Sequence, residues 1–453
     1  MTDQLATAGG TTDIDGRRLG TRALIVHPVL RSDALAIKHA DAALEEARGL
    51  AEAISLKVLD AAVARIERHD AGTFFRKGTV EAWAEKVKEH GAELVVVDGQ
   101  ISPVQQRNLE KAWKCKVIDR TALILEIFGA RAQTREGRLQ VELAHLLYQR
   151  TRLVRSWTHL ERQRGGGGFL GGPGETQLEL DKRHLGDRIL KLQGDLAEVS
   201  TRRELHRKSR EAPIVALVGY TNAGKSTLFN RLTGAEVMAK DMLFATLDPT
   251  MRGIVLPSGQ KAVLSDTVGF ISNLPTHLVA AFRATLEEVV NADIIVHVRD
   301  IAHIETERQR QSVNQVLGEL GLSADVTAGT VIEALNKIDR LDPAARAVVE
   351  EHARRSNAGI QVPLSALTGE GCDRLLGVLD DRLGSLRKIV ELAVPHTEGA
   401  ALAWLYRHGE IIDRQDGEFS SRLKLSINPI DLERFRQKFP GYAAGETKPR
   451  LDA

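Results

Sequence analysis

The sequence has little of several features that would narrow its class. Only two of the 453 residues are cysteines, Cys115 and Cys372, and their separation offers neither a disulfide framework nor a metal-binding spacing. No apolar run approaches the length needed to cross a bilayer, so we expect no membrane span. Residues 1–16 are polar and rich in glycine, threonine and aspartate, the opposite of a signal peptide. We therefore expect a cytoplasmic protein with a disordered leader over residues 1–19.

Net charge is also nearly absent, at +1, but the charge is not evenly spread. Residues 131–164 contain eight Arg or Lys against three acidic residues, and residues 181–210 contain nine against five. The middle of the chain is therefore basic. The composition, 43% hydrophobic and 27% charged, is typical of a folded globular protein, and the length favours two to four domains.

Apolar periodicity predicts an α/β protein of several domains. Residues 23–26 and 93–97 are apolar runs of strand length, and residues 115–119 look like a third strand. Helical patterns lie at 40–53 and 79–90. This alternation indicates an N-terminal α/β domain over residues 20–130. Residues 211–390 alternate in the same way. Residues 394–453, with a strand pattern at 422–427 and a helical stretch after Pro429, indicate a small C-terminal α+β domain.

The basic segment, residues 131–210, has leucines spaced three and four residues apart over two long stretches. This pattern predicts an antiparallel coiled-coil hairpin, although two core helices of the preceding domain would fit too. The joining loop, residues 162–175, contains seven glycines around Phe169 and Leu170, and Arg155, Arg162 and Arg164 lie just before it. Such a loop is either a flexible linker or a probe that becomes ordered on a partner.

One motif carries recognisable chemistry. An apolar strand pattern at residues 214–218 runs directly into a P-loop, in which backbone N–H groups and a helix N-terminus bind phosphate. Lys225 is predicted to reach the β- and γ-phosphates and Ser226 to bind Mg²⁺. The predicted phosphate-binding residues are Gly219, Tyr220, Thr221, Asn222, Ala223, Gly224, Lys225, Ser226 and Thr227. The P-loop alone does not separate ATP from GTP.

A second motif selects guanine. Asn336, Lys337 and Asp339 follow the apolar residues 331–335, at the end of a strand where α/β sheets bind ligands. The carboxylate of Asp339 can accept two hydrogen bonds from guanine, whereas adenine lacks that donor pair. Asn336 would brace the loop and the stem of Lys337 would cover the base. After another strand follow Ser365, Ala366 and Leu367, and the Ala366 N–H would meet guanine O6.

Between these motifs lie the predicted γ-phosphate sensors. Asp266 ends a strand pattern and would hold Mg²⁺ through a water, and the Gly269 N–H would contact the γ-phosphate. Upstream, Thr246 is favoured over Thr250 as the switch threonine that binds Mg²⁺. We assign Lys225, Thr246 and Gly269 to catalysis. Loss of the γ-phosphate would release both switch segments.

The block from Asp266 to Glu288 and the glycine-rich block from Gly165 to Glu179 resemble the HflX family of translation-factor-related GTPases. The resemblance covers nearly the whole chain after the leader. It implies the same four-part domain order, a cytoplasmic GTPase that binds the large ribosomal subunit and its RNA, and the splitting of stalled or stressed ribosomes. Basic residues of the hairpin and the Phe169–Leu170 tip would then contact the ribosome. We expect a monomer.

The chain departs from this family at one point. The family often has a Gly-x-Gly-Lys element in its first domain, where this chain has Arg76-Lys77-Gly78-Thr79. Residues 20–130 contain no recognisable phosphate loop, so ATP binding by that domain is not carried over. Two other functions share the nucleotide motifs. A GTPase partner in tRNA modification would need a folate or redox-cofactor domain and a cysteine near the C-terminus, and neither is recognisable in this sequence. A regulatory adaptor that controls protein partners would need neither the basic arm nor its glycine-rich apolar tip.

The sequence also bears on how hydrolysis is activated. Many GTPases place a glutamine just after Asp-x-x-Gly to orient the attacking water, whereas this chain has Phe270 there. A phenylalanine cannot do that work, so we expect slow turnover that the ribosome stimulates. Asn222 raises a further possibility, because related GTPases with asparagine at this position use K⁺ to neutralise charge.

Overall fold

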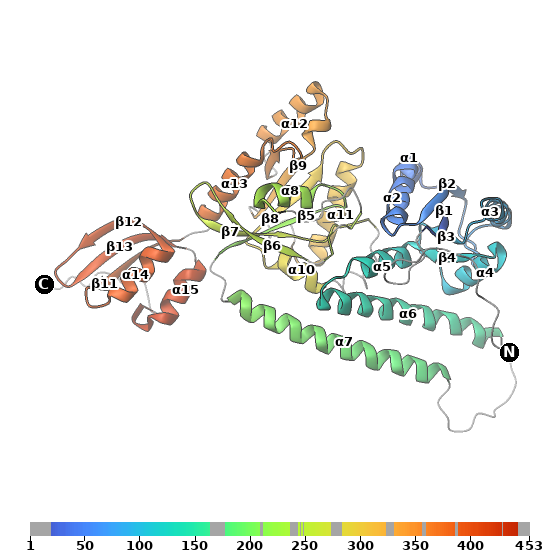
Figure 1. Cartoon of the computed structure of the whole chain (residues 1–453), viewed down its shortest axis with the longest axis horizontal. Coiled ribbons are helices and arrows are strands. Elements are labelled where there is room, and N and C mark those ends of the chain that lie inside the picture. Colours follow the sequence, from blue (N-terminus) through green and yellow to red (C-terminus); the bar gives the residue numbers. More distant parts are fainter. Residues whose placement is uncertain are drawn as a thin grey trace.

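The computed structural model describes residues 20–163, 177–208, 212–235, 243–244, 246–247, 249–272, 283–322, 330–355, 359–385, 388–427 and 429–442. The described elements form three β-sheets, and a pair of long helices runs beneath the first two (Figure 1). The predicted leader and the loop residues 164–175 lie outside the described residues. In the part of the chain that is described, no helix combines the length and the apolar character of a membrane span.

The first sheet is parallel, with strand order β2-β1-β3-β4. Its strands are β1 (Arg22–Leu30), β2 (Lys57–Ile66), β3 (Leu94–Val97) and β4 (Lys116–Asp119). Its helices are α1 (Ala34–Lys38), α2 (Ala40–Ala53), α3 (Lys77–His90), α4 (Pro103–Trp113) and α5 (Arg120–Arg131). Alternate residues of β1 face opposite ways: Ala23 and Ile25 pack with α2 and α5, whereas Leu24 and Val26 pack with α3 and α4. The carboxyl ends of the strands therefore open onto one edge between two helical layers.

Strand β2 is missing from the strands that the sequence predicts, for a physical reason. Asp60 interrupts its apolar residues, and the run that follows, residues 61–64, is mostly alanine, which is depleted in strands. β1 is also longer than predicted and continues through Pro28. Beyond Val26 the strand has β2 on one side only, because β3 ends at Val97. Proline has no backbone N–H to donate, and it is tolerated at Pro28 because the strand has a neighbour on only one side at this point.

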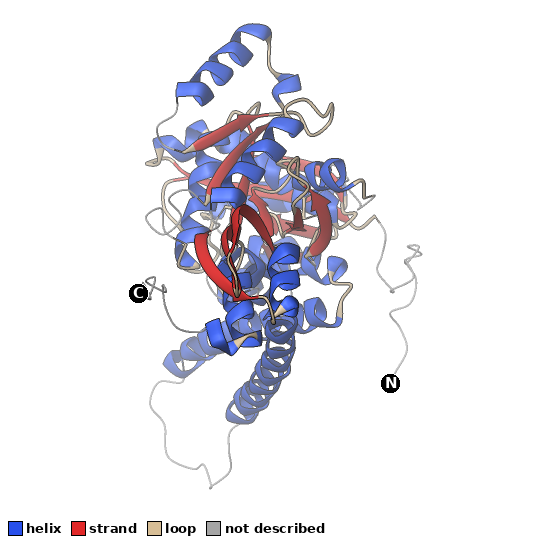
Figure 2. Ribbon diagram, turned by 90° about the vertical axis from the view of Figure 1, so that its left-hand side faces the viewer, coloured by secondary structure: helices blue, strands red, loops and turns tan. Residues whose placement is uncertain are grey.

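The second layer of the molecule is the helix pair α6 (Arg135–Gln163) and α7 (Gln177–Lys208), which lie side by side (Figures 1 and 2). Leu143 of α6 is buried against Ile189 and Leu192 of α7. α6 also packs on the N-terminal domain, since the hydroxyl of Tyr148 donates to Asp119 Oδ1 at 2.9 Å. The hairpin is therefore anchored along one of its two helices.

The second sheet has the order β10-β9-β8-β5-β7-β6, and of its described strands β6 is antiparallel to its neighbour. The strands are β5 (Ile214–Gly219), β6 (Thr250–Val255), β7 (Lys261–Asp266), β8 (Ile294–Asp300), β9 (Val331–Asn336) and β10 (Ile360–Pro363). The helices are α8 (Lys225–Thr233), α10 (Arg283–Val290), α11 (Thr306–Glu319), η1 (Ile338–Arg340), α12 (Pro343–Arg355) and α13 (Cys372–Ser385). This sheet, with helices on both faces, confirms the predicted α/β class.

The third sheet is antiparallel, in the order β11-β13-β12. Its elements are β11 (Lys388–Pro395), α14 (Gly399–His408), β12 (Gly409–Asp416), β13 (Ser420–Ile427), α15 (Pro429–Lys438) and η2 (Pro440–Tyr442). Leu423 and Leu425 are buried against Leu405 and Phe435 of the two helices. β11 begins at Lys388, whereas the sequence-based boundaries leave residues 388–390 with the GTPase domain. The first residues of β11 pair with β13, which places them in the third sheet.

Candidate nucleotide-binding site

The P-loop joins β5 to α8 at the carboxyl edge of the second sheet. Gly224 caps the N-terminus of α8 with φ of +94°, in the left-handed region that favours glycine. A Cβ atom on Gly224 would lie 2.2 Å from Asn336 Nδ2, so a side chain does not fit there. The loop therefore wraps tightly around the start of the helix, where backbone N–H groups attract anions.

Lys225 lies inside this loop and is only 6% exposed. Its Nζ donates to the backbone oxygens of Gly219, at 3.1 Å, and of Tyr220, at 2.8 Å. Burial lowers the pKa of Lys225 to about 8, and the charge of Asp266 opposes that shift. A phosphate group beside Nζ would favour the charged ammonium further.

Three oxygen-bearing side chains meet next to the lysine. Ser226 Oγ donates to Asp266 Oδ2 at 2.7 Å, and Thr246 Oγ1 donates to the same oxygen at 3.0 Å. The two hydroxyl oxygens are themselves 3.0 Å apart. Thr250, the other candidate, begins β6 opposite Asp266 in the strand register. The hydroxyl that reaches the carboxylate is therefore that of Thr246.

This oxygen cluster has the chemistry of a Mg²⁺ site. Two hydroxyls and one carboxylate are hard oxygen ligands, the type that Mg²⁺ prefers. Among the described residues, nothing donates to the buried Oδ1 of Asp266, nor does the buried Oγ1 of Thr221 have a partner. Burial raises the pKa of the Asp266 carboxyl, which Lys225 opposes. A bound cation with its water shell would satisfy the carboxylate and favour its charged form.

The segment after Asp266 lies against the P-loop. Gly269 is so close that an added Cβ would be 2.9 Å from Thr221 Cγ2 and 3.1 Å from Lys225 Nζ. Phe270 donates its N–H to Gly219 O at 3.0 Å and accepts from Thr221 N at 2.8 Å. Its side chain is only 3% exposed, so it packs in the core beside the loop.

The loops that are predicted to recognise the base are tied to the P-loop through Asn336. Its Nδ2 donates to Ala223 O at 2.8 Å, and its Oδ1 accepts from Ala366 N at 2.9 Å. Lys337, with φ of +67°, directs its Nζ to Asn222 O at 2.8 Å. The buried amide of Asn336 thus holds together its own loop, the P-loop and the loop that contains Ala366.

The remaining predicted contacts lie at the rim. Asp339 is exposed on η1, and Leu367 is exposed whereas Ser365 is buried. The Ala366 N–H bonds to Asn336, so a contact with guanine O6 requires that bond to be shared or exchanged. The roles of these side chains toward guanine stay predictions.

Sequence reasoning missed two residues that support these loops. Asp300, at the end of β8, forms an ion pair with Lys337 Nζ at 2.7 Å. Arg231, on α8, donates its Nε to Ala366 O at 3.2 Å. The sequence offers a signal for Asp300, because this acidic residue ends a strand pattern at the edge where the motif residues lie. Nothing near Arg231 in the sequence points to a loop more than a hundred residues away.

The predicted ribosome contacts are not placed by the structure. Arg155 and Arg162 lie on α6, but the described part of that helix does not extend to their side chains. Arg164, Phe169 and Leu170 lie outside the described residues.

A phosphate loop on a parallel sheet, the Asp-x-x-Gly segment beside it and the Asn-Lys-x-Asp loop braced against it define a P-loop GTPase. Four family models match the chain in succession. They are described as GTP-binding GTPase N-terminal at residues 41–129, GTP-binding GTPase middle region at 131–210, 50S ribosome-binding GTPase at 214–337 and HflX C-terminal domain at 347–439. The chain belongs to the HflX family of GTPases, and it is a GTP-hydrolysing enzyme.

Curated relatives agree over most of the chain. GTPase HflX of Magnetococcus marinus is 48% identical over 396 residues, which cover 87% of this chain and 90% of the relative. GTPase HflX of Escherichia coli is 45% identical, with 81% and 85% covered. A GTP-binding protein from Sulfolobus solfataricus in complex with GDP is 24% identical, with a TM-score of 0.42 and coverage of 80% and 98%.

Proposed function

We propose that this GTPase binds the large ribosomal subunit in its GTP state and separates stalled or stressed ribosomes. The observation that carries the proposal is the match of residues 214–337 to a model described as a 50S ribosome-binding GTPase, within a chain that matches the other family models as well. Neither a tRNA-modifying partner nor an adaptor has comparable support. We propose that the protein acts in the cytoplasm, where ribosomes are found, and that it acts as a monomer.

The nucleotide would be held by the groups that the loops bring together. We assign the phosphates to Lys225 and the P-loop N–H groups, and the γ-phosphate to the Gly269 N–H. Ser226 and Thr246 would bind Mg²⁺ directly, and Asp266 would bind it through a water. The ion supplies positive charge next to the phosphate oxygens during transfer. Guanine would be recognised by Asp339.

The α6–α7 hairpin is the part suited to a ribosomal partner. Its two helices form a long arm in which Arg188 Nε donates to Glu142 Oε1 at 2.8 Å across the pair. Lys182, Arg183 and Lys191 are exposed along α7. These exposed basic side chains lie on a helix that leads from the glycine-rich loop, so they are suited to contact the phosphates of ribosomal RNA.

A deletion of residues 165–174 tests the splitting function. We expect the deleted protein to keep GTP binding and basal hydrolysis, because those depend on the second sheet, and to lose ribosome splitting in a sucrose-gradient assay. The matched control replaces the same ten residues with a Gly/Ser segment of equal length, and should fail too if the Phe169–Leu170 tip is required.

Sedimentation with large subunits measures ribosome binding separately from ribosome splitting. The intact protein should sediment with large subunits in a non-hydrolysable GTP analogue and not in GDP, and its affinity should fall steeply with salt. A deleted protein that splits ribosomes at the normal rate would reduce the loop to a linker. An intact protein that never sediments with large subunits would refute the proposed function itself.

A further inference from the structure

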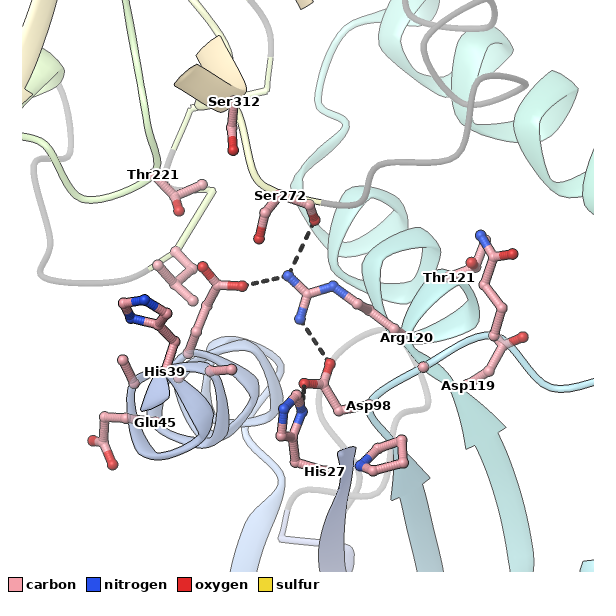
Figure 3. Close-up of a pocket in the computed structure, with 18 of the residues that line it drawn as sticks. His27, His39, Glu45, Asp98, Asp119, Arg120, Thr121, Thr221, Ser272 and Ser312 are labelled. Carbon is pink, nitrogen blue, oxygen red and sulfur yellow. Dashed lines mark hydrogen bonds and ion pairs between the residues drawn. The ribbon is translucent and has the colours of Figure 1, made fainter. Parts of the chain in front are cut away.

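The N-terminal domain reaches the nucleotide site through one buried polar cluster. Glu46, on α2, accepts a hydrogen bond from the hydroxyl of Tyr220, which belongs to the P-loop. Arg120, at the start of α5, donates to Glu46 and also to the backbone oxygen of Ser272 at 3.3 Å. Figure 3 shows Arg120 extended between Asp98 on one side and Ser272 on the other. Both partners in the GTPase domain adjoin phosphate-sensing segments.

The N-terminal domain fixes the orientation of Arg120. Its Nη1 donates to Asp98 Oδ1 at 2.7 Å, and His27 Nδ1 lies 2.7 Å from the other oxygen of that carboxylate. The side chains of Arg120 and Asp98 are 9% and 4% exposed. A buried ion pair of this kind tolerates little displacement, because a lost partner leaves an uncompensated charge. The guanidinium is thus presented to the GTPase domain in one position.

Hydrogen counting at Tyr220 gives Glu46 a specific task. The Tyr220 oxygen lies 2.9 Å from the backbone nitrogen of Ser272 and 2.9 Å from its Oγ. A tyrosine hydroxyl has a single hydrogen to donate, and the carboxylate of Glu46 has none. The Tyr220 hydrogen therefore goes to Glu46, and both Ser272 groups donate to the Tyr220 oxygen. Glu46 thus sets the direction of the bond between the two hydroxyls, whereas Arg120 and the Ser272 N–H can only donate.

The cluster lies within a few residues of the groups that sense nucleotide. The backbone oxygen of Tyr220 accepts from Lys225 Nζ at 2.8 Å, and Ser272 follows Gly269 by three residues. The first switch segment is held by the same face of the N-terminal domain. Phe244 lies two residues before Thr246, and its ring packs edge-on against the ring of Phe128 of α5, with 4.8 Å between the ring centroids. Helix α5 therefore contacts both switch segments, and α2 contacts the P-loop through Glu46.

We propose that Glu46 and Arg120 are positioning residues that strengthen the preference of the site for GTP over GDP. They hold Ser272 and Tyr220 so that Gly269 is already placed for the γ-phosphate, and less conformational freedom is lost when GTP binds. GDP has no γ-phosphate and gains nothing from this order. The inference rests on the proposed contact between Gly269 and the γ-phosphate.

Nucleotide affinities of the full chain with Mg²⁺ test this proposal. In Glu46→Gln, the amide can donate a hydrogen to Tyr220 and no longer needs to accept one. Affinity for a non-hydrolysable GTP analogue should fall at least about threefold, while GDP affinity stays the same within about 1.5-fold. Tyr220→Phe removes the same contact from the other side. The analogue-to-GDP ratio of the double variant should equal that of Tyr220→Phe, since the residues act through each other.

The matched control is His39→Gln. His39 Nδ1 contacts Glu305 across the same domain interface, and among the described residues no side-chain hydrogen bond joins His39 to the nucleotide loops. It should leave the analogue-to-GDP ratio unchanged. An unchanged ratio in Glu46→Gln and Tyr220→Phe, or an equal shift in His39→Gln, would overturn the proposal and leave the cluster as a domain contact. A Gly269→Ala protein that keeps its preference for the analogue would instead remove the premise about Gly269. Ribosomes are absent from the assay, so the splitting function is not involved.

Discussion

At the scale of the residue, guanine selection depends in our assignment on one exposed carboxylate. Asp339 follows Lys337, whose left-handed backbone and ion pair with Asp300 set the direction of the loop. The amide of Asn336 ties that loop to the P-loop below it. The carboxylate is thus presented at the rim of a rigid support, which is the geometry that bidentate recognition needs.

Asp339→Asn tests this assignment. The substitution replaces a double acceptor with a mixed donor and acceptor, so GTP binding should weaken by more than about 2 kcal/mol, because one guanine donor is left mispaired. Affinity for xanthosine triphosphate should rise. Asp342→Asn is the matched control: Asp342 Oδ1 caps α12 through Ala345 N at 2.8 Å, and an asparagine caps equally well. Unchanged GTP affinity in Asp339→Asn, measured by calorimetry, would place the base pocket elsewhere.

At the scale of the element, local patterns predicted what depends on local chemistry. The strands β3 and β5 are continuous apolar runs, and β9 is apolar except for Glu333 and its last residue. The loops after β5 and β9 have their motif residues in one short stretch each. β2 was missed because it is an alanine-rich strand whose place depends on pairing with β1. The contact of Glu46 with Tyr220 was out of reach for the same reason, since it joins residues 174 positions apart.

Strand β8 carries a buried histidine that should make stability depend on pH. His297 is 2% exposed, and burial lowers its pKa to about 4. Glu333 of β9 opposes that shift, whereas Arg299, Arg310 and Lys225 add to it. The unfolded chain, with a pKa near 6.5, therefore binds more protons below that pH than the folded chain does. Folding stability is full above pH 6.5 and is lost as the pH falls toward 4.

Replacing the histidine should remove this dependence. Between pH 6.5 and pH 5 the free energy of unfolding should fall by about 1.6 kcal/mol more in the parent protein than in His297→Gln. Urea titrations of the nucleotide-free protein at several pH values measure the difference. The matched control is His184→Gln, on an exposed part of α7. Its free energy of unfolding should change with pH as it does in the parent protein. Equal slopes in the parent and His297→Gln would show that His297 does not carry the effect.

At the scale of the whole molecule, the described residues include the predicted nucleotide-binding groups, but a phenylalanine stands where many GTPases have a glutamine that orients the attacking water. Phe270 takes the place of the usual glutamine and is buried, with both backbone groups bonded to the P-loop. Asn222, by contrast, is exposed on the P-loop with φ of +59°, where its side chain could help to hold a cation. We therefore expect a bound ion, a partner or both to supply the group that orients the water.

This argument predicts that the isolated protein turns over slowly and that large ribosomal subunits stimulate it by at least about tenfold, which requires only about 1.4 kcal/mol of transition-state stabilisation. If K⁺ neutralises charge beside Asn222, turnover should also be faster in K⁺ than in Na⁺ at equal ionic strength, and Asn222→Ala should erase that difference. Phosphate release with and without subunits, in each salt, measures both effects. Fast hydrolysis by the isolated protein in both salts, indifferent to ribosomes, would contradict partner activation, because a complete catalytic site would then exist within the chain itself.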